Sequence, residues 1–307
     1  MRNAAFKKIF YEAKKNKKII FIGSDLGYGV MEEMKKTLPQ QFFMEGVCEQ
    51  NIVGLSAGLA MEGFVPYINT IGTFLTRRCY EQILLDVCLH NLPVRFLGNG
   101  GGGVYASLGP THLSLDDYAI LRVIPNMKIY APCDAIESEQ IIKSTFLDKS
   151  PTYIRLARGG EEIISEKGQF KPGKARVLVK NNKEKLVIFS TGITSQIAKK
   201  AAEELKKSGI NISVTHFATI KPLDEKYLNK VFNRINKIII IEEHVRSGGF
   251  GSQVLEYFNN KCNYKNINIK IMSAPDKFVN RYGNHSDLLN LWGITVKNII
   301  KEVKKFI

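Results

Sequence analysis

Short apolar runs alternate with amphipathic segments along the whole chain. The runs at 18–22, 65–71, 94–97 and 128–130 are typical of buried strands, and a further strand begins at Pro151. The segments between them place apolar residues at helical spacing. Because strands that alternate with helices form largely parallel sheets, the pattern predicts an α/β fold.

The same alternation resumes after a polar stretch in the middle of the chain. Residues 164–178 contain Gly168, Pro172, Gly173 and many charges, which predicts a linker. Beyond it the pattern predicts strands at 185–191, 212–217, 237–242 and 267–272, helices at 194–208 and 224–235, and a C-terminal helix. We therefore predict two doubly wound domains, residues 1–163 and 179–307.

Composition and length agree with two globular domains. The chain has 307 residues, of which 44% are hydrophobic and 24% are charged. It contains no apolar run long enough to predict a transmembrane helix. Near the N-terminus, Phe6, Ile9, Phe10 and Ala13 have helical spacing and lysines interrupt them, unlike a signal peptide. We expect a cytoplasmic protein without a membrane partner.

Charge and cysteine content narrow the classes of function. A formal net charge of +15 raises nucleic acid as a partner. The lysines are spread over predicted helix faces and loops, however, and no RNP, zinc-finger or helix-turn-helix signature accompanies them. The five cysteines show neither CxxC nor Cys/His spacing. We therefore expect no nucleic-acid partner, reduced thiols and no metal ligands on this chain.

A glycine-rich loop, GNGGGGVYASLGPTH, follows the strand at 94–97. It contains GxGxxG at Gly98, Gly100 and Gly103, but a dinucleotide site needs a helix to open there, and Pro110 falls where that helix would run. A P-loop would need Gly-Lys-Ser/Thr, which is absent. We expect these glycines to let the backbone approach a ligand or a neighbouring chain closely.

Several polar and aromatic residues are candidates for chemistry. Glu49 follows an apolar run and opens a small-residue helix, either as an exposed first-turn acid or as a buried carboxylate with a specific partner. Asp25 follows the first strand, where α/β sheets bind ligands, although it could cap the next helix. Phe74, Arg77 and Tyr80 are spaced by three on a long amphipathic helix and so share a face.

Two further junctions carry charged residues. Asp134 and Glu137 have the spacing of a capping box at the start of a helix. The segment EEHVRSGGFGSQV, residues 242–254, places charges and glycines between a strand and a helix, which is typical of a turn that contacts an anion or a backbone.

Seven segments together resemble the thiamine-diphosphate enzymes of the transketolase family. In family order they read FMEGVCEQNIVGLSAGLA, TFLTRRCYEQ, LGPTH, IPNMKIYAPCD, RLARG, IKPLD and EEHVRSGGFG. The resemblance covers essentially the whole chain and corresponds to the C-terminal half of a full-length enzyme. It implies a pyrimidine-binding domain followed by the transketolase C-terminal domain.

The resemblance also implies residues that bind the cofactor, thiamine diphosphate. Glu49 matches the family glutamate that hydrogen-bonds the aminopyrimidine ring and so helps the thiazolium carbon to lose its proton. Phe74 matches the aromatic residue that packs against the pyrimidine, and Tyr80 lies on the same helix face. Asp25 is a further candidate for cofactor binding.

Substrate residues follow in the same way. His112, in LGPTH, matches a histidine that contacts substrate oxygens and aids proton transfer. Arg158, in RLARG, matches an arginine that binds a substrate phosphate, and Arg2 aligns with another. Arg77 occupies a position that is Arg in the deoxyxylulose-phosphate synthase branch. Leu108 stands where the family usually has an Asp that recognises a sugar hydroxyl, so we expect altered acceptor recognition.

A family motif is missing from this sequence. The Gly-Asp-Gly…Asn motif, which in the family holds a divalent metal and the cofactor's diphosphate, does not occur. The resemblance therefore implies a separate N-terminal subunit that carries the diphosphate-binding domain and the Mg²⁺ ligands, in a heterotetramer of two chains of each kind. The activity implied is that of the C-terminal subunit of a split transketolase, which moves a two-carbon ketol unit between sugars or sugar phosphates.

Three alternatives stay open at this point. The β subunit of a 2-oxo acid dehydrogenase E1 shares the two domains but generally lacks the GPTH context. A 1-deoxy-D-xylulose-5-phosphate synthase-like enzyme would have an Arg close to the position of Gly101. A non-catalytic homologue would not need Glu49, Phe74 and His112.

Overall fold

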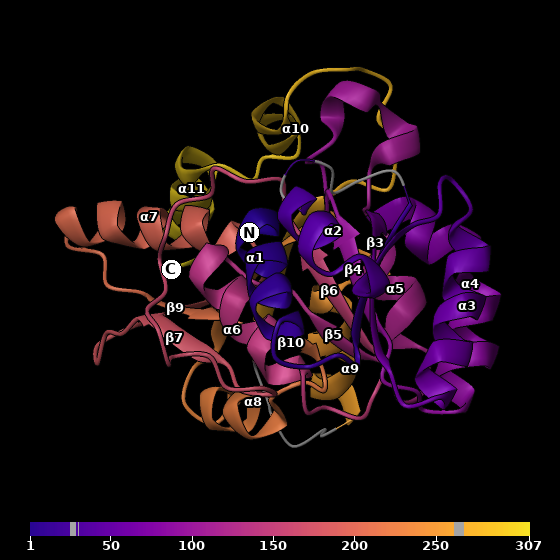
Figure 1. Cartoon of the computed structure of the whole chain (residues 1–307). Helices are drawn as coiled ribbons and strands as arrows, with labels where there is room; N and C mark the ends of the chain where they lie inside the picture. The colour runs from indigo at the N-terminus through magenta and orange to yellow at the C-terminus, as the bar shows by residue number, and fades with distance from the viewer. Residues whose placement is uncertain (25–28, 30, 261–266) are drawn as a thin grey trace.

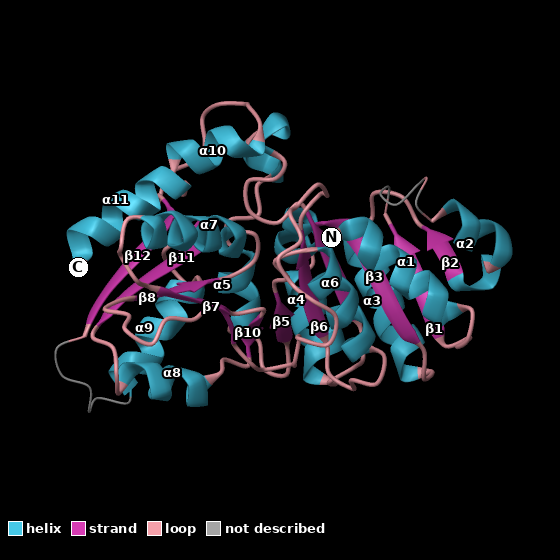
Figure 2. Ribbon diagram, turned by 90° about the vertical axis from the view of Figure 1, so that its left-hand side faces the viewer, coloured by secondary structure: helices cyan, strands magenta, loops and turns pink. Residues whose placement is uncertain are grey.

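The computed structural model describes residues 1–24, 29, 31–260 and 267–307. Two sheets lie side by side, and helices cover both faces of each (Figure 1, Figure 2). This confirms the α/β fold with two doubly wound units. None of the helices in the described ranges is both long enough and apolar enough to cross a membrane.

The first sheet has seven strands in the order β10-β5-β6-β4-β3-β1-β2. All neighbours in it are parallel except β10 and β5. Its strands from the first half of the chain are β1 (Ile19–Gly23), β2 (Phe42–Met44), β3 (Val65–Ile71), β4 (Arg95–Asn99), β5 (Lys128–Tyr130) and β6 (Thr152–Leu156). Its helices are α1 (Arg2–Ala13), α2 (Glu32–Thr37), α3 (Glu49–Met61), α5 (Asp117–Arg122) and α6 (Ala135–Thr145).

Strand β1 shows why these runs are apolar throughout. Ile20 and Ile22 belong to one core cluster, whereas Ile19 and Phe21 belong to another. Alternate side chains of a strand point to opposite faces, so a strand covered on both faces needs apolar residues at every position. The run therefore predicts a buried parallel strand correctly.

The second sheet has five strands in the order β12-β11-β8-β9-β7. They are β7 (Arg176–Val179), β8 (Val187–Ser190), β9 (Ser213–His216), β11 (Lys237–Val245) and β12 (Asn268–Ala274), with β7 antiparallel to β9. The helices of this half are α7 (Thr194–Lys207), α8 (Glu225–Phe232), α9 (Phe250–Asn260), α10 (His285–Leu291) and α11 (Val296–Phe306). Residues 157–175 form no helix or strand, and β7 begins inside the predicted linker.

One strand joins the two halves. Strand β10 (Thr219–Lys221) comes from the second half of the sequence but pairs antiparallel with β5 at the edge of the first sheet. The sequence pattern suggests one sheet for each half instead. A strand of three residues carries too little periodicity to predict which sheet it joins.

The helix that was predicted after β3 is wound irregularly. It consists of a π-helical turn η2 (Phe74–Arg78), a short α4 (Tyr80–Gln82) and a second π-helical segment η3 (Ile83–Leu89). A π turn takes more residues than an α turn, because its hydrogen bonds run from i to i+5. Residues four apart therefore come closer to one face, which brings Arg78 rather than Arg77 beside Phe74. Single π turns inside helices occur frequently at functional sites.

Candidate functional site

Polar side chains gather where the parallel strands of the first sheet end. Glu49 opens α3, which follows β2. Phe74 follows β3, and His112 lies in the loop after β4, at the end of a 3-10 turn (η5, Pro110–His112). Because the carboxyl ends of parallel strands meet at one edge of a sheet, the fold brings these three segments together.

Glu49 is a buried carboxylate and not an exposed first-turn acid. Only 4% of its side chain is exposed. Its Oε2 accepts a hydrogen bond from Arg78 Nη1 at 3.1 Å. Its Oε1 is buried and accepts no hydrogen bond from the described residues. A buried carboxylate oxygen without a partner is costly, so this atom faces a place where a donor is needed.

Arg78 and Phe74 connect Glu49 to His112. The rings of Phe74 and His112 meet edge to face with centroids 5.0 Å apart. The guanidinium carbon of Arg78 lies 4.0 Å from the centroid of the Phe74 ring. His112 Nδ1 lies 2.8 Å from the hydroxyl of Thr111. The predicted Glu49, Phe74 and His112 thus belong to one cluster, and Arg78 is a member that the sequence analysis missed.

Arg77 holds the His112 loop to the π turn. Its Nε and Nη2 donate to the two carboxylate oxygens of Asp116 at 2.8 and 2.9 Å, and Nη2 also donates to the carbonyl of Leu113 at 3.2 Å. Arg77 and Thr111 line a groove of about 700 Å³ beside this contact. The bidentate pair fixes the orientation of the guanidinium at the rim of the groove.

The other predicted residues lie apart from this cluster. Arg158 is exposed after β6 and lines a separate hollow of about 520 Å³ with Ser107 and His285. Arg2 opens α1 and is half-buried. Tyr80 packs against the main hydrophobic core. Asp25 lies outside the described residues.

His285 is a second residue that the sequence analysis did not single out. Its Nε2 lies against Glu243 Oε1, which also accepts a hydrogen bond from the backbone N–H of Gly103 at 2.7 Å. Burial lowers the pKa of His285, but Glu243 outweighs burial and raises that pKa above its ordinary value. Arg158 and His285 line this hollow together with Glu161, so it holds groups of both charges. The two partners are 42 residues apart, so no local motif signals the pair.

The glycine-rich loop is packed against side chains of its own chain. A Cβ on Gly100 would lie 2.0 Å from the ring of Tyr105, and one on Gly102 would lie 2.2 Å from the carboxyl carbon of Glu243. Both glycines have positive φ, of 72° and 69°. The backbone therefore lies close to side chains of its own chain, and the expected approach to a ligand or a neighbouring chain stays a prediction.

The turn at residues 242–254 contacts a backbone. Glu242 Oε2 accepts from the N–H of Phe250 at 2.7 Å, and Oε1 accepts from Gly251 at 3.1 Å. Burial raises the pKa of Glu242 to about 8. The first N–H groups of α9 are thus satisfied by the chain's own carboxyl group, which leaves no room there for an external anion.

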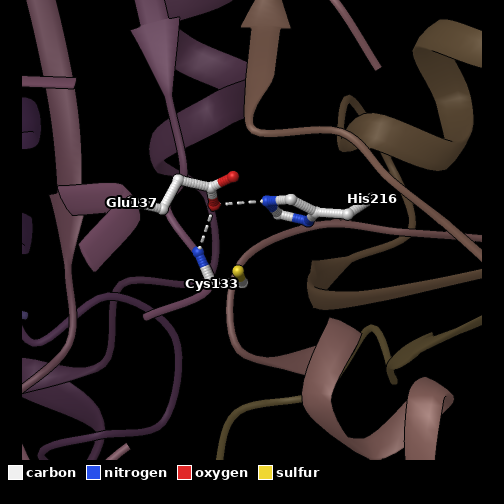
Figure 3. Close-up of side chains that lie close together, drawn as sticks. All are labelled: Cys133, Glu137 and His216. Atoms are coloured by element: carbon white, nitrogen blue, oxygen red, sulfur yellow. Dashed lines mark hydrogen bonds and ion pairs between the residues drawn. The ribbon is translucent and has the colours of Figure 1, made fainter. Parts of the chain in front are cut away.

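A separate, buried cluster joins the two halves of the chain. Figure 3 shows Cys133, Glu137 and His216 pointing toward one another, with Glu137 from α6 and His216 from β9. His216 Nε2 lies 2.7 Å from Glu137 Oε2, and its Nδ1 lies 2.6 Å from Ser195 Oγ. All four side chains are fully buried, so this Ser–His–Glu arrangement is closed to a substrate.

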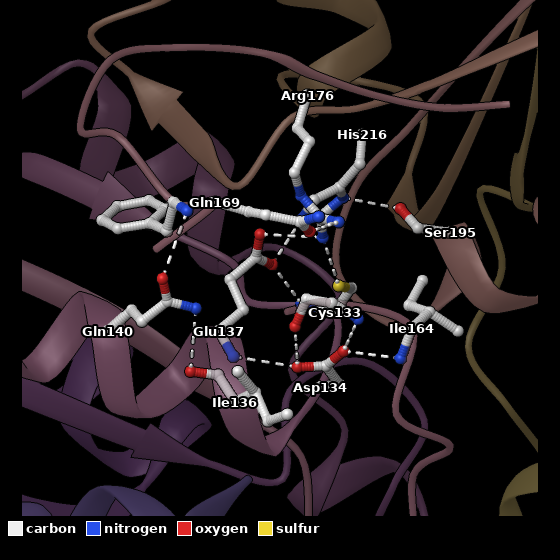
Figure 4. A network of polar contacts seen from close by, with 12 residues as sticks. Cys133, Asp134, Ile136, Glu137, Gln140, Ile164, Gln169, Arg176, Ser195 and His216 are labelled. Atoms are coloured by element: carbon white, nitrogen blue, oxygen red, sulfur yellow. Dashed lines mark hydrogen bonds and ion pairs between the residues drawn. The ribbon is translucent and has the colours of Figure 1, made fainter. Parts of the chain in front are cut away.

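This cluster is the one group of metal-ligating side chains in the described part of the chain. Arg176 donates to Cys133 Sγ at 3.3 Å and to Glu137 Oε1 at 3.1 Å, as Figure 4 shows. The guanidinium therefore already supplies the positive charge that a metal would bring. Burial raises the pKa of Cys133 well above its ordinary value, which disfavours the thiolate that binds metals. The cluster fits a structural ion-pair network.

The predicted capping box is only half formed. Asp134 Oδ1 accepts from the N–H of Glu137 at 2.9 Å, as an N-cap residue does. The Glu137 carboxylate turns instead to Cys133 N–H, His216 and Arg176. The bond from the Glu137 side chain to the backbone N–H of Asp134, which would complete a capping box, is thus replaced by a long-range ion pair.

Both halves of the chain match models of known protein families. The family model described as "Transketolase, pyrimidine binding domain" matches residues 1–160. The one described as "Transketolase, C-terminal domain" matches residues 173–299. Among curated relatives, 1-deoxy-D-xylulose-5-phosphate synthase of Caldanaerobacter subterraneus subsp. tengcongensis is 36% identical over 290 residues, which are 94% of this chain and 46% of that protein. The chain thus spans about half the length of the synthases that it matches.

A relative of similar length is also found. One subunit of the apulose-4-phosphate transketolase of Phocaeicola vulgatus is 32% identical over 298 residues, with 96% of this chain and 93% of that protein covered. A solved structure described as a split gene transketolase, an inactive β4 tetramer, superposes with a TM-score of 0.87 at 29% identity and covers 99% of this chain and 97% of that one. The chain therefore belongs to the transketolase family, with its pyrimidine-binding domain followed by its C-terminal domain.

Proposed function

We propose that this chain is the C-terminal subunit of a split transketolase, which transfers a two-carbon ketol unit between sugars with thiamine diphosphate as cofactor. The observation that carries the proposal is Glu49 Oε1, a buried acceptor without a partner among the described residues, while Arg78 bridges the Glu49 carboxylate and the ring of Phe74. An aminopyrimidine ring has a planar face for Phe74 and donor groups for Glu49. The residues present therefore fit the pyrimidine half of the cofactor.

The diphosphate half needs a second chain. The family motif Gly-Asp-Gly…Asn is absent from the sequence, and the described residues offer no acidic cluster at this edge of the sheet that could hold Mg²⁺. Two relatives of matching length are described as a transketolase subunit and as a split gene transketolase. We propose a partner subunit that supplies the diphosphate and Mg²⁺ ligands, and an α2β2 assembly in which the active site lies between chains.

The residues of this chain would then act as follows. When bound, thiamine diphosphate supplies the carbon that carries the ketol unit. Glu49 hydrogen-bonds the pyrimidine ring and shares a proton with it. Phe74 holds the ring by stacking. His112, whose ring meets Phe74, exchanges a proton with substrate oxygens at the mouth of the site.

The arginines and Leu108 would set substrate choice. Arg77 orders the His112 loop and lines the neighbouring groove, and exposed Arg158 binds a phosphate beside His285. Leu108 is 46% exposed and offers no hydrogen bond from its side chain where the family usually has an Asp. We propose that the acceptor is bound without that hydroxyl contact. Arg2 stays a candidate for phosphate binding, as do Tyr80 and Asp25 for the cofactor.

A second candidate function is synthesis of 1-deoxy-D-xylulose 5-phosphate. The 36% identity to a synthase of that name favours it, as does Arg77. The sequence departs from that branch at Gly101, and a relative of matching length is described as part of a transketolase. Ketol transfer therefore remains the first proposal.

The test is reconstitution with a candidate partner, a separate chain that carries the Gly-Asp-Gly…Asn motif. The mixture, supplied with thiamine diphosphate and Mg²⁺, is assayed for ketol transfer and for formation of 1-deoxy-D-xylulose 5-phosphate. Glu49→Gln should lower turnover at least about 100-fold, whereas Glu184→Gln, at another buried carboxylate outside the site, should leave it unchanged. Turnover that survives Glu49→Gln would refute the role of Glu49, and synthase product alone would favour the second candidate.

A further inference from the structure

Arg78 makes the contacts that the proposed cofactor would need. Its guanidinium donates to Glu49 at 3.1 Å and lies 4.0 Å over the ring of Phe74. These are the carboxylate and the aromatic face that fit an aminopyrimidine. A guanidinium is itself planar and rich in N–H donors, so it can satisfy both groups in the same way.

Arg78 and a pyrimidine ring cannot use the Phe74 face together. A ring inserted between two planar groups needs about 3.5 Å on each side, or about 7 Å in all. The observed separation is 4.0 Å. Either the guanidinium leaves or the ring stays out.

The side chain is free to move. Arg78 is 48% exposed, and Glu49 is the hydrogen-bond partner that the described structure gives it. Its neighbour Arg77 is anchored instead by two bonds to Asp116. Arg78 can therefore swing into solvent without any change in the backbone of the π turn.

We propose that Arg78 occupies the pyrimidine position in the cofactor-free chain and is displaced when the cofactor binds. The proposal rests on the proposed function. Without a cofactor, Arg78 neutralises a carboxylate that would otherwise be buried and unpaired. Its displacement subtracts from the affinity for thiamine diphosphate, so the residue acts as a gate on cofactor loading and delays it until the diphosphate ligands of the partner add their share of binding.

The experiment is a calorimetric titration of the reconstituted two-chain complex with thiamine diphosphate and Mg²⁺. Arg78→Ala and Arg78→Met remove the competing cation. Each should bind about five- to tenfold more tightly than the wild type, a gain of about 1–1.4 kcal/mol. Arg78→Lys keeps a positive charge near Glu49, so its affinity for the cofactor should lie between that of the wild type and that of Arg78→Ala. Loss of a merely structural contact would not tighten binding.

Arg234 provides a matched control. It is 51% exposed and is paired with a nearly buried carboxylate, that of Glu184, just as Arg78 is paired with Glu49. Arg234→Ala should leave the Kd of the cofactor unchanged. Equal or weaker binding by both Arg78→Ala and Arg78→Met, with a wild-type complex that binds normally, would overturn this inference alone. A wild-type complex that fails to bind the cofactor would overturn the proposed function and this inference with it.

Discussion

The buried contact between Glu137 and His216 makes a testable claim about how the two halves of the chain hold together. Glu137 on α6 accepts from His216 Nε2 at 2.7 Å, from Arg176 at 3.1 Å and from the N–H of Cys133 at 2.8 Å. His216 and Arg176 belong to the second half. The change Glu137→Gln keeps the shape of the side chain but removes the charge and turns an amide group toward donors.

The pKa of Glu137 gives the size of its contribution to the free energy of unfolding. Burial opposes ionisation, but His216 and Arg176 outweigh it and lower the pKa from its ordinary 4.5 to about 2. At about 1.36 kcal/mol for each pKa unit, the ionised group contributes about 3 kcal/mol to folding at neutral pH. Removing one partner of a buried ion pair typically costs about 3–5 kcal/mol, which agrees.

The sign of the pH dependence follows from the direction of the shift. Since the folded pKa lies below the unfolded one, the contribution is fully present above about pH 4.5 and is lost as the pH falls toward 2. In urea unfolding followed by circular dichroism, Glu137→Gln should lose about 3 kcal/mol at pH 7 and less than half of that at pH 3.

A surface carboxylate provides the control for that measurement. Glu256 is 55% exposed and pairs with Arg122, so Glu256→Gln should cost less than about 1 kcal/mol. If Glu137→Gln loses less than about 1 kcal/mol at pH 7, or loses the same amount at both pH values, the ionised carboxylate does not hold the two halves together.

Three further predictions concern the loops around the site. Gly102→Ala should destabilise the fold by more than about 2 kcal/mol in the same urea assay, because the new Cβ would collide with Glu243 and the residue has a positive φ. Gly160→Ala is the control: it also has a positive φ but open space around it, so it should cost only about 1 kcal/mol. Asp134→Ala removes the N-cap of α6 and also the bonds that this buried carboxylate accepts from Ile164 and Ser165, so it should lower the free energy of unfolding by more than about 2 kcal/mol, and a loss below about 1 kcal/mol would contradict these contacts. Leu108→Asp, at a half-exposed site, should change stability by less than about 0.5 kcal/mol but should change kcat/KM for hydroxylated acceptors in the reconstituted assay, and identical acceptor profiles would refute its role.

Long apolar runs made much of the fold predictable. Strands β3 and β5 begin and end where the sequence pattern placed them, because most of their residues are apolar and buried. The pairing of strand β10 was not predictable, since its partner β5 lies in the other half of the chain. Local patterns carry no information on such pairings.

The candidate site was predictable where chemistry is local. Glu49, Phe74 and His112 stand in motifs, and the structure brings them together. Whether Glu49 is exposed or buried could not be decided from sequence, because both alternatives fit a helix start. Arg78 was missed because helical spacing by three favoured Arg77, and the π turn shifts the face.

Contacts between distant segments account for the rest. His285 and Glu243 are brought together by the packing of α10 near the end of β11. The Glu137 carboxylate contacts a histidine 79 residues away and does not make the return bond of a capping box. In both cases tertiary packing decides between local and distant partners.

The most direct test of a cofactor site shared between two chains is calorimetry with thiamine diphosphate and Mg²⁺, on this chain alone and on its mixture with the proposed partner. We expect tight binding in the mixture and none that can be measured with the chain alone, because the proposed roles of Glu49 and Phe74 involve only the pyrimidine half of the cofactor. Tight binding by the chain alone would contradict a shared site, since the diphosphate and metal ligands would then have to lie on this chain.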